Sequence, residues 1–331
     1  MISIVVPVFN CADYLDQCVR SLLTQNWDDL EILLINDGST DRSGSICDHF
    51  SALDSRVRVV HRKNGGVSSA RNLGMDMARG DLLMFVDADD YVEPEFVGSM
   101  AHNMKHHDIV TCAYDRVRSI SQPFVLGKSC EISMADLYEH TLCTLMIGGG
   151  CCNKIFRMDI VRELSLRFDT RIAVGEDLLL LVQYLKRCRS AYYIGEILYH
   201  YRYNEASATE AGFTSQKLSQ GSISVLTAMD EMERHIDRGV RYQADAMDYR
   251  KSRSSLRLFF QMVLARSPEP AVLKAIQKHI RQSLFTFLKS RHSKTLERVV
   301  AAAIAVSATP TYVLARAAAP LLKERLGAYR T

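Results

Sequence analysis

Three aspartates within four positions, Asp87, Asp89 and Asp90, directly follow "LLMFV", an apolar run typical of a buried strand. At about 4 Å, two such charges repel each other by roughly 1 kcal/mol in water, and by more near a protein surface. Solvated turn positions are one explanation, because Asp is common in turns. A divalent cation is the other, since Mg²⁺ and Mn²⁺ prefer oxygen ligands and Mg²⁺ usually combines one or two carboxylates with substrate phosphates. The cluster therefore predicts a metal and diphosphate site, which is the chemistry of nucleotide binding.

The scaffold that positions these aspartates is predicted from the alternation of apolar runs and helical spacing. Short runs rich in β-branched residues are typical of strands buried on both faces, and they occupy 2–6, 31–35, 57–60, 82–86 and 109–113. Between them, apolar residues recur at helical spacing, for example from Tyr14 to Leu23. This order predicts an α/β fold with a doubly wound, mostly parallel sheet, whose ligands bind at the carboxyl ends of the strands.

Polar residues follow three of the predicted strands: "PVFN" ends the first, "NDGSTD" the second and "DADD" the fourth. The Asp-Gly pair of the second segment is also a hairpin signal. Residues 41–53 have helical spacing, however, which favours a strand-to-helix turn. The three strand ends together predict a polar crevice.

Other metal and phosphate signatures are missing. The sequence has no G-x-G-x-x-G, and "GGGCCNK" at 148–154 lacks the G-K-[ST] of a P-loop. His102 and His106 are expected on a solvated helix face, because no acidic residue lies in metal-ligand register with them. The nine cysteines are scattered without a C-x-x-C pair, which argues against a disulfide framework or zinc site and favours a reducing cytoplasm. The N-terminal "MISIVVPVFN" is predicted to be a strand, not a signal peptide.

The C-terminal part is basic. From residue 241 onward, 17 Lys and Arg stand against 5 Asp and Glu, whereas residues 1–240 carry 24 against 33. From about residue 214 the spacing is helical, with breaks near 265–270 and 307–311. Such a tail is typical of a segment that meets an anionic surface. Its few aromatic residues and its apolar helices argue against nucleic acid as the partner.

The apolar run 299–315 decides what kind of surface is expected. It contains Ser307, Thr309, Pro310 and Thr311, which makes it short and polar for a membrane-spanning helix. An amphipathic segment that lies on the anionic inner face of the cell membrane fits better. A plain helical cap and a true span are the alternatives.

Six segments, in their order along the sequence, resemble the successive motifs of bacterial family-2 glycosyltransferases with the GT-A fold. They are "SIVVPVFN", "EILLINDGSTDRSGSICD", "GGVSSARNLGMDMARGDLLMFVDADDY", "CCNKIFR", "GEDLLL" and "YHYR". The resemblance covers residues 1 to about 205. It implies an inverting transfer of a sugar from a nucleotide-sugar donor, with a UDP-sugar expected, to a hydroxyl of a glycan acceptor. It also implies a lipid-linked, polyprenyl-diphosphate type of acceptor in surface polysaccharide biosynthesis.

The resemblance further implies roles for single residues. Asp89 and Asp87 would bind Mn²⁺ or Mg²⁺ as the D-x-D motif, and Asp177 would be the catalytic base, with Glu176 as second choice. Contacts to the nucleotide sugar are implied for Pro7, Val8, Phe9, Asn10, Asp37, Arg71, Asp87 and Ala88. Contacts to the acceptor or diphosphate are implied for Lys154, His200 and Arg202.

Two positions depart from the commonest family pattern. Asn36 replaces a frequent Asp, and Ala12 stands where an acidic residue is usual, which puts one base or ribose contact in doubt. The expected domains are 1–212, with a nucleotide-sugar half at 1–113 and an acceptor half at 114–212, and a basic helical region at 213–331.

The residue chemistry agrees with this interpretation, because a metal ion can stabilise a departing diphosphate and only one further carboxylate is needed as base. A helix N-cap is the plain alternative for Asp177, and the two roles are compatible. Three other classes of protein share part of this residue pattern. A phosphatase of the haloacid dehalogenase type is disfavoured by Tyr91 at the fifth motif position, and a silent partner protein would be expected to have lost Asp89 or Asp177. A metal-dependent nucleotidyltransferase would also bind a nucleotide together with a metal ion, and it is the remaining alternative.

Overall fold

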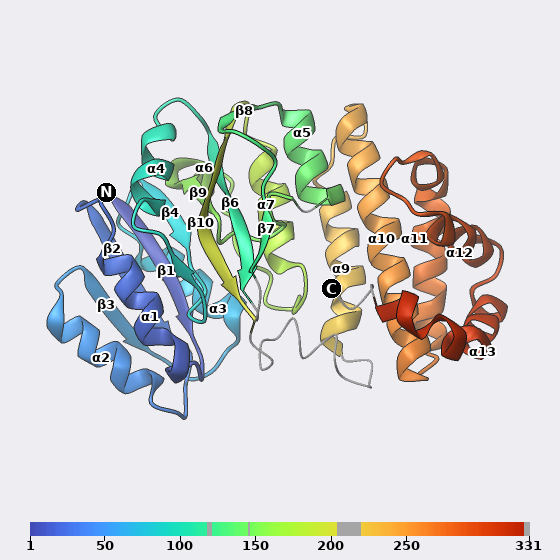
Figure 1. The fold of residues 1–331 in the computed structure, drawn as a ribbon, viewed down its shortest axis with the longest axis horizontal. Helices are drawn as coiled ribbons and strands as arrows, with labels where there is room; N and C mark the ends of the chain where they lie inside the picture. The colour runs from blue at the N-terminus through green and yellow to red at the C-terminus, as the bar shows by residue number, and fades with distance from the viewer. Residues whose placement is uncertain (118–120, 145, 204–219, 328–331) are drawn as a thin grey trace. The chain divides into compact units, whose positions relative to one another are not determined.

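The computed structural model describes residues 1–117, 121–144, 146–203 and 220–327 (Figure 1). The chain forms two compact units. The sheet unit comprises Met1–Thr141, Leu145–Thr170 and Glu176–Tyr203, and the helical unit comprises Leu142–Thr144, Arg171–Gly175 and Asn204–Thr331. The domain boundary predicted at residue 212 lies outside the described residues.

The first half of the sheet is parallel. Its strands lie in the order β3-β2-β1-β4, and each pairs in parallel with its neighbour. Their bounds are β1 Ile2–Val8, β2 Leu30–Asn36, β3 Val57–His61 and β4 Leu82–Phe85. β1 and β2 are buried along almost their whole length, as expected for strands covered on both faces. The chain leaves β2 for a helix, so the strand-to-helix interpretation of "NDGS" is confirmed.

The second half of the sheet is mixed. β9, Lys154–Arg157, runs antiparallel between β4 and β6, Ile109–Val117. β6 pairs in parallel with β10, Ala191–Arg202, and three short strands pair antiparallel with these two. The short strands are β5 Tyr91–Val92, β7 Ser121–Phe124 and β8 Cys130–Ile132. β9 was missed because four residues that begin with a lysine carry too little of the strand pattern.

Helices pack on the sheet through apolar faces. α1 buries Leu15, Cys18, Val19 and Leu22, which is the spacing that predicted it. The helices of this unit are α1 Ala12–Leu23, α2 Ser43–Leu53, α3 Val67–Met77, α4 Phe96–Asn103, α5 Met134–Glu139, α6 Met158–Glu163 and α7 Glu176–Leu185. A π-helical turn, His140–Thr144, follows α5.

The helical unit has its own apolar core, which includes Phe259, Ile276, Phe287 and Ile304. Its helices are α9 Gln220–Glu233, α10 Arg241–Ala265, α11 Pro270–Lys289, α12 Thr295–Val306 and α13 Ala308–Gly327 (Figure 1, yellow to red). The predicted breaks between α10 and α11 and at Ser307 are confirmed. The break at 290–294 was missed because it holds neither Gly nor Pro. No helix in the described part of the chain is long and apolar enough to cross a membrane.

Close packing of α3 on β1 generates a first prediction. A Cβ atom on Gly74 would lie 2.3 Å from Cγ1 of the buried Val5. We expect Gly74→Ala to lower the free energy of unfolding by about 1–3 kcal/mol, because overpacking outweighs the better helix propensity of alanine. Urea unfolding measures the change.

Ser69→Ala, on the same helix, is the matched control, because it adds no atom and should change stability by less than about 0.5 kcal/mol. Equal stabilities of Gly74→Ala and the wild type would show that α3 does not depend on this contact.

Candidate active site

The polar strand ends meet at one edge of the sheet. Val8 lies opposite Asn36 in the register of β1 and β2, and the backbone N–H of Val86 donates to the carbonyl of Val5 at 3.1 Å. Of the "PVFN" residues, Val8 is buried whereas Phe9 and Asn10 are exposed beyond the strand. Ala88 is buried as well. Any contact of Val8 or Ala88 with a nucleotide would therefore have to come from backbone atoms.

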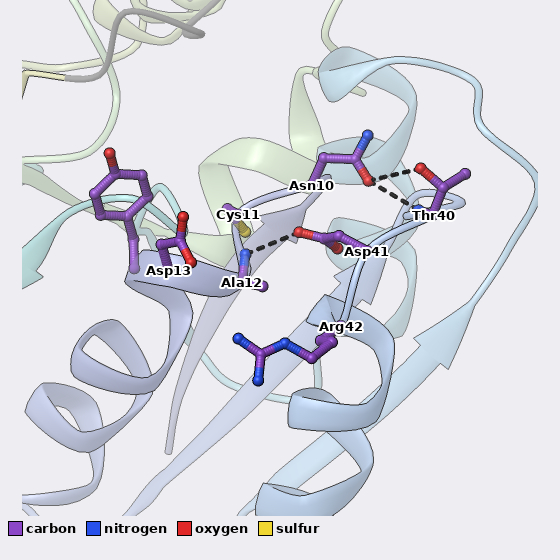
Figure 2. Close-up of a pocket in the computed structure, with 8 residues that line it drawn as sticks. Asn10, Cys11, Ala12, Asp13, Thr40, Asp41 and Arg42 are labelled. Carbon is purple, nitrogen blue, oxygen red and sulfur yellow. Dashed lines mark hydrogen bonds between the residues drawn. The ribbon is translucent and has the colours of Figure 1, made fainter.

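A pocket of about 470 Å³ opens beside the ends of β1 and β2 (Figure 2). Asn10 accepts from the backbone N–H of Thr40 at 2.8 Å, and Asp41 accepts from that of Ala12 at 3.0 Å. These bonds join the start of α1 to the turn before α2. The lining residues are Asn10, Cys11, Ala12, Asp13, Tyr14, Thr40, Asp41 and Arg42. Only Asn10 among them was a predicted site residue, although the polar segments after both strands carried the signal for the others.

Asp37 organises the loop that precedes α3. Its side chain is buried, and its carboxylate accepts from the backbone N–H groups of Gly65 and Gly66 at 3.0 and 2.8 Å. Arg62 forms an ion pair with it at 3.1 Å. Gly66 has a φ of 87°, a left-handed conformation that favours glycine. The predicted contact of Asp37 with the nucleotide base stays a prediction.

Arg71 links three elements of the site. From α3 its guanidinium donates to Asp87 at the end of β4, at 2.7 Å, and to Glu176 at the start of α7, at 3.1 Å. The same group lies over the ring of Phe168, 5.3 Å from the centroid. Arg71 is buried, so the two carboxylates compensate a cation that has lost its water.

The three clustered aspartates have different environments. Asp87 faces Arg71 and Asp89 is partly exposed, whereas Asp90 is buried. Asp90 accepts from the Tyr199 hydroxyl at 2.6 Å and from the backbone N–H of Arg202 at 2.8 Å. Burial, together with the charges of Asp89 and Asp87, raises the pKa of Asp90 well above its ordinary value. Thus the Arg71 cation beside Asp87 and the raised pKa of Asp90 both act against the repulsion that, from the sequence alone, calls for a metal ion.

Among the three aspartates, Asp89 would therefore be the main ligand of a metal ion. No group of three His, Cys, Asp or Glu side chains in the described ranges is arranged to hold a metal ion. Mg²⁺ bound together with substrate phosphates needs only one or two carboxylates. The partly exposed Asp89, with Asp87 beside it, fits that mode of binding.

Glu176 and Asp177 are the first two residues of α7, and their side chains differ in exposure and in partners. Burial raises the pKa of Glu176 to about 7, with Asp177 acting in the same direction and Arg71 against it. Burial also raises the pKa of Asp177, which Arg71 opposes. Asp177 is partly exposed, and a Cβ on Gly150 would lie 3.0 Å from its Oδ2 atom. Glu176 is held by the buried ion pair with Arg71, so Asp177 is the more accessible of the two carboxylates.

Lys154 is fully buried at the start of β9. Its Nζ donates to the carbonyls of Ile147 and Gly148 and to the side-chain oxygen of Asn153, at 2.8, 2.9 and 2.8 Å. Burial lowers its pKa to about 8. All three donors are used within the chain, which argues against the predicted direct contact with acceptor or diphosphate. Lys154 instead holds the glycine-rich loop that approaches Asp177.

His200 is likewise engaged within the sheet unit. Its Nδ1 lies 2.7 Å from Asp115 and its Nε2 lies 2.8 Å from Glu93, and its ring stacks on Tyr91. Both ring nitrogens thus have carboxylate partners. The predicted ligand contact of His200 would require one of these partners to be exchanged.

Arg202 lies beside the pocket. Its guanidinium is 5.1 Å from the ring centroid of Tyr14, a lining residue, and 5.2 Å from that of Tyr91. Its contact with a diphosphate remains a prediction that this position favours. Of the three residues predicted to contact the acceptor or diphosphate, Arg202 is the best placed.

Three comparisons with known proteins bear on this site. Residues 3–165 match the family Glycosyl transferase family 2. The chain is 33% identical over 218 residues to "Uncharacterized glycosyltransferase EpsJ" of Bacillus subtilis (strain 168), and the match covers 63% of each chain.

Two solved structures share the fold. One is TarS 1–349 of S. aureus in complex with UDP-GlcNAc, with a TM-score of 0.71, 15% identity and coverage of 97% of this chain and 91% of that one. The other is the mannosyltransferase PcManGT of Pyrobaculum calidifontis in complex with GDP-Man and Mn²⁺, with a TM-score of 0.56, 12% identity and coverage of 97% and 87%.

Removal of Arg71 should destabilise the protein in a pH-dependent manner. Arg71→Met leaves Glu176 buried without its cation, which we expect to cost about 3 kcal/mol of unfolding free energy. From its ordinary value of 4.5 up to about 7, the folded state keeps a proton on Glu176 that the unfolded chain releases, so this contribution to stability falls as pH rises. Without Arg71, which lowers the pKa of Glu176, stability falls more as pH rises. The loss of unfolding free energy in Arg71→Met, measured by urea unfolding, should therefore be larger at about pH 8 than at about pH 5.

Arg58→Met is the matched control, because Arg58 also pairs with a buried glutamate, Glu31, at 2.6 Å. In Arg58→Met, burial still raises the pKa of Glu31, but the hydrogen bonds from Ser3 and the Arg79 backbone N–H remain and lower it. The stability deficit of Arg58→Met should therefore grow less between about pH 5 and about pH 8 than that of Arg71→Met. A deficit of Arg71→Met that is the same at both pH values would contradict the role given to this arginine.

Proposed function

Because the chain belongs to glycosyl transferase family 2 and has the GT-A fold, we propose that it is an inverting transferase of a sugar from a nucleotide-sugar donor to a hydroxyl of a glycan acceptor. The observation that carries the proposal is the Arg71 bridge. It joins the D-x-D residue Asp87 to the carboxylate pair at the start of α7. The chain matches 63% of the length of its curated relative EpsJ, so the activity is proposed for the chain as given.

The donor is proposed to be a UDP-sugar carrying a hexose or an N-acetylhexosamine. Support comes from TarS, whose structure holds UDP-GlcNAc on the same fold. The exposed Phe9 and Asn10 follow β1 and the buried Asp37 follows β2, and a base and ribose would bind at these neighbouring strand ends. Arg202 and Tyr14 lie at the rim of the pocket beside these strand ends.

Asp89 and Asp87 would hold a divalent metal, Mn²⁺ or Mg²⁺, together with the donor diphosphate. When bound, such an ion supplies Lewis-acid stabilisation of the leaving diphosphate. The Mn²⁺ in PcManGT, which shares the fold, supports this assignment. Asp90 has no part in it, because Tyr199 and the Arg202 backbone engage both of its oxygens.

Asp177 is the proposed general base. The acceptor hydroxyl would attack the anomeric carbon from the face opposite the diphosphate, so the new C–O bond forms as the bond to the diphosphate oxygen breaks and the configuration inverts. The Asp177 carboxylate would take the proton of the attacking hydroxyl. Burial raises the pKa of Asp177 and makes it a stronger base than an exposed aspartate. Arg71 fixes the start of α7 through Glu176, and Gly150 leaves space next to Asp177.

The acceptor is proposed to be a lipid-linked intermediate of surface polysaccharide synthesis, processed at the inner face of the cell membrane. The basic composition after residue 240 supports contact with an anionic membrane surface. The resemblance of the ordered motifs to bacterial enzymes of this family supports the type of acceptor.

Asp89→Ala tests the metal site. The variant should stay folded, because it loses a charge that is repelled by its neighbours, yet it should lose sugar transfer and Mn²⁺-dependent binding of a nucleoside diphosphate. Calorimetric titration with UDP, with and without Mn²⁺, measures the binding. Asp81→Ala, at the other end of β4, is the control and should behave as the wild type. Retained Mn²⁺-dependent binding by Asp89→Ala would remove Asp89 from the metal site.

Asp177→Asn tests the base. Asparagine keeps the shape and capping ability of aspartate but cannot take the proton, so the transfer rate should fall by roughly 10² to 10⁴. The dissociation constant of the donor should be nearly unchanged. Glu176→Gln is the comparison, with a smaller loss of rate and a loss of stability from the broken ion pair with Arg71. A crippled Glu176→Gln beside an active Asp177→Asn would reverse the two roles.

A further inference from the structure

The exposed face of α11 is a cationic stripe. Lys274, Lys278, Arg281, Phe285 and Lys289 are exposed at intervals of three or four residues, while the opposite face packs into the core of the helical unit. The Lys289 ammonium lies 3.9 Å from the centroid of the Phe285 ring, which is 71% exposed. No described carboxylate lies within ion-pair distance of Lys274, Lys278 or Lys289. The charges of these three lysines are therefore not neutralised by an ion pair with a described carboxylate.

The neighbouring helix α12 exposes an apolar stripe. Val299, Ala303 and Val306 are exposed at intervals of four and three residues, and the two valines are 62% and 79% exposed. Its one acidic residue, Glu297, is buried and paired with Arg253. An apolar stripe of this kind gains free energy when it leaves water.

The two stripes form one surface. Arg281 of α11 and Gln277 one turn earlier donate to the last carbonyl groups of α12, each reaching Val306 at 3.1 Å. Figure 1 shows α11 and α12 as neighbours in the helical unit. Between Pro270 and Ala317 the sequence holds eight Lys and Arg and only one acidic residue, the buried Glu297.

We propose that this α11–α12 face, defined by Lys274, Lys278, Arg281, Phe285, Val299 and Val306, is the docking surface for an anionic lipid bilayer. The lysines would meet headgroup phosphates, and the valines and Phe285 would enter the boundary with the acyl chains. The inference gives the membrane contact of the proposed function a location, and rests on that function only for the identity of the acceptor.

Charge and polarity together favour a bilayer over other occupants. A nucleic acid would use the cations but would leave the two exposed valines in water. A second copy of the chain would bury the valines but would bring the two cationic stripes near each other. An anionic membrane satisfies both stripes at once, because its surface is negative and its interior is apolar.

The test is co-sedimentation of the full chain with vesicles of phosphatidylcholine alone or mixed with phosphatidylglycerol, at low and high salt. The wild type should bind the mixed vesicles in a salt-sensitive manner. Each lysine near an anionic surface contributes about fivefold to binding, so Lys274→Gln/Lys278→Gln should bind about 25-fold more weakly. Val299→Ser/Val306→Ser should weaken binding to the same vesicles by about tenfold.

The matched control is Lys105→Gln/Lys186→Gln, which removes two exposed lysines of the sheet unit and should bind as the wild type. Thermal melts confirm that each variant is folded. Donor hydrolysis, measured in parallel without vesicles, should be unchanged in all variants, so a failed transferase assay and a failed docking assay are told apart.

Four outcomes of the binding assays would overturn the proposal. They are no binding of the wild type to mixed vesicles, equal binding by the α11 variant, salt-resistant binding to neutral vesicles, and tighter binding to duplex DNA than to mixed vesicles. Light scattering that shows a dimer broken by Val299→Ser/Val306→Ser would assign the face to a second copy instead.

Discussion

A single buried cation holds the proposed active site together. Arg71 contributes a guanidinium that has left water, and such a charge is tolerated only where carboxylates surround it. Its two partners, Asp87 and Glu176, come from the end of β4 and the start of α7, which are far apart in the sequence. The position of Arg71 depends in turn on Gly74, one turn later in α3, which lets that helix approach β1. The proposed base and the proposed metal ligands are thus positioned relative to each other by one ion-paired network.

Carboxylates that look alike in the sequence have different surroundings in the structure. Asp87 is ion-paired, Asp89 is partly exposed, and Asp90 is buried with a raised pKa. In the second pair, Arg71 engages Glu176 and leaves Asp177 free of that ion pair. The chemistry follows from these differences, because a metal ligand needs an accessible charge whereas a buried, hydrogen-bonded acid serves the fold.

Much of the sheet unit was predictable from the sequence, since β1, β2 and β4 have apolar runs that only a doubly covered sheet explains. Their polar ends located the proposed site. The internal engagement of Lys154 and His200 could not be predicted, because a motif gives the type of a residue and its spacing but not its partners. In the structure, backbone carbonyls of a turn hold Lys154, and carboxylates from β6 and the segment after β5 hold His200.

The central claim is that the carboxyl edge of the sheet binds a nucleotide sugar together with a divalent cation. Thermal shift of the wild-type chain against a panel of UDP-, GDP- and TDP-sugars, each with and without Mn²⁺, tests it most directly. One nucleotide class should raise the melting temperature, and the rise should require Mn²⁺ or grow with it. Stabilisation by none of the nucleotide sugars, in the presence or absence of Mn²⁺, would contradict the account.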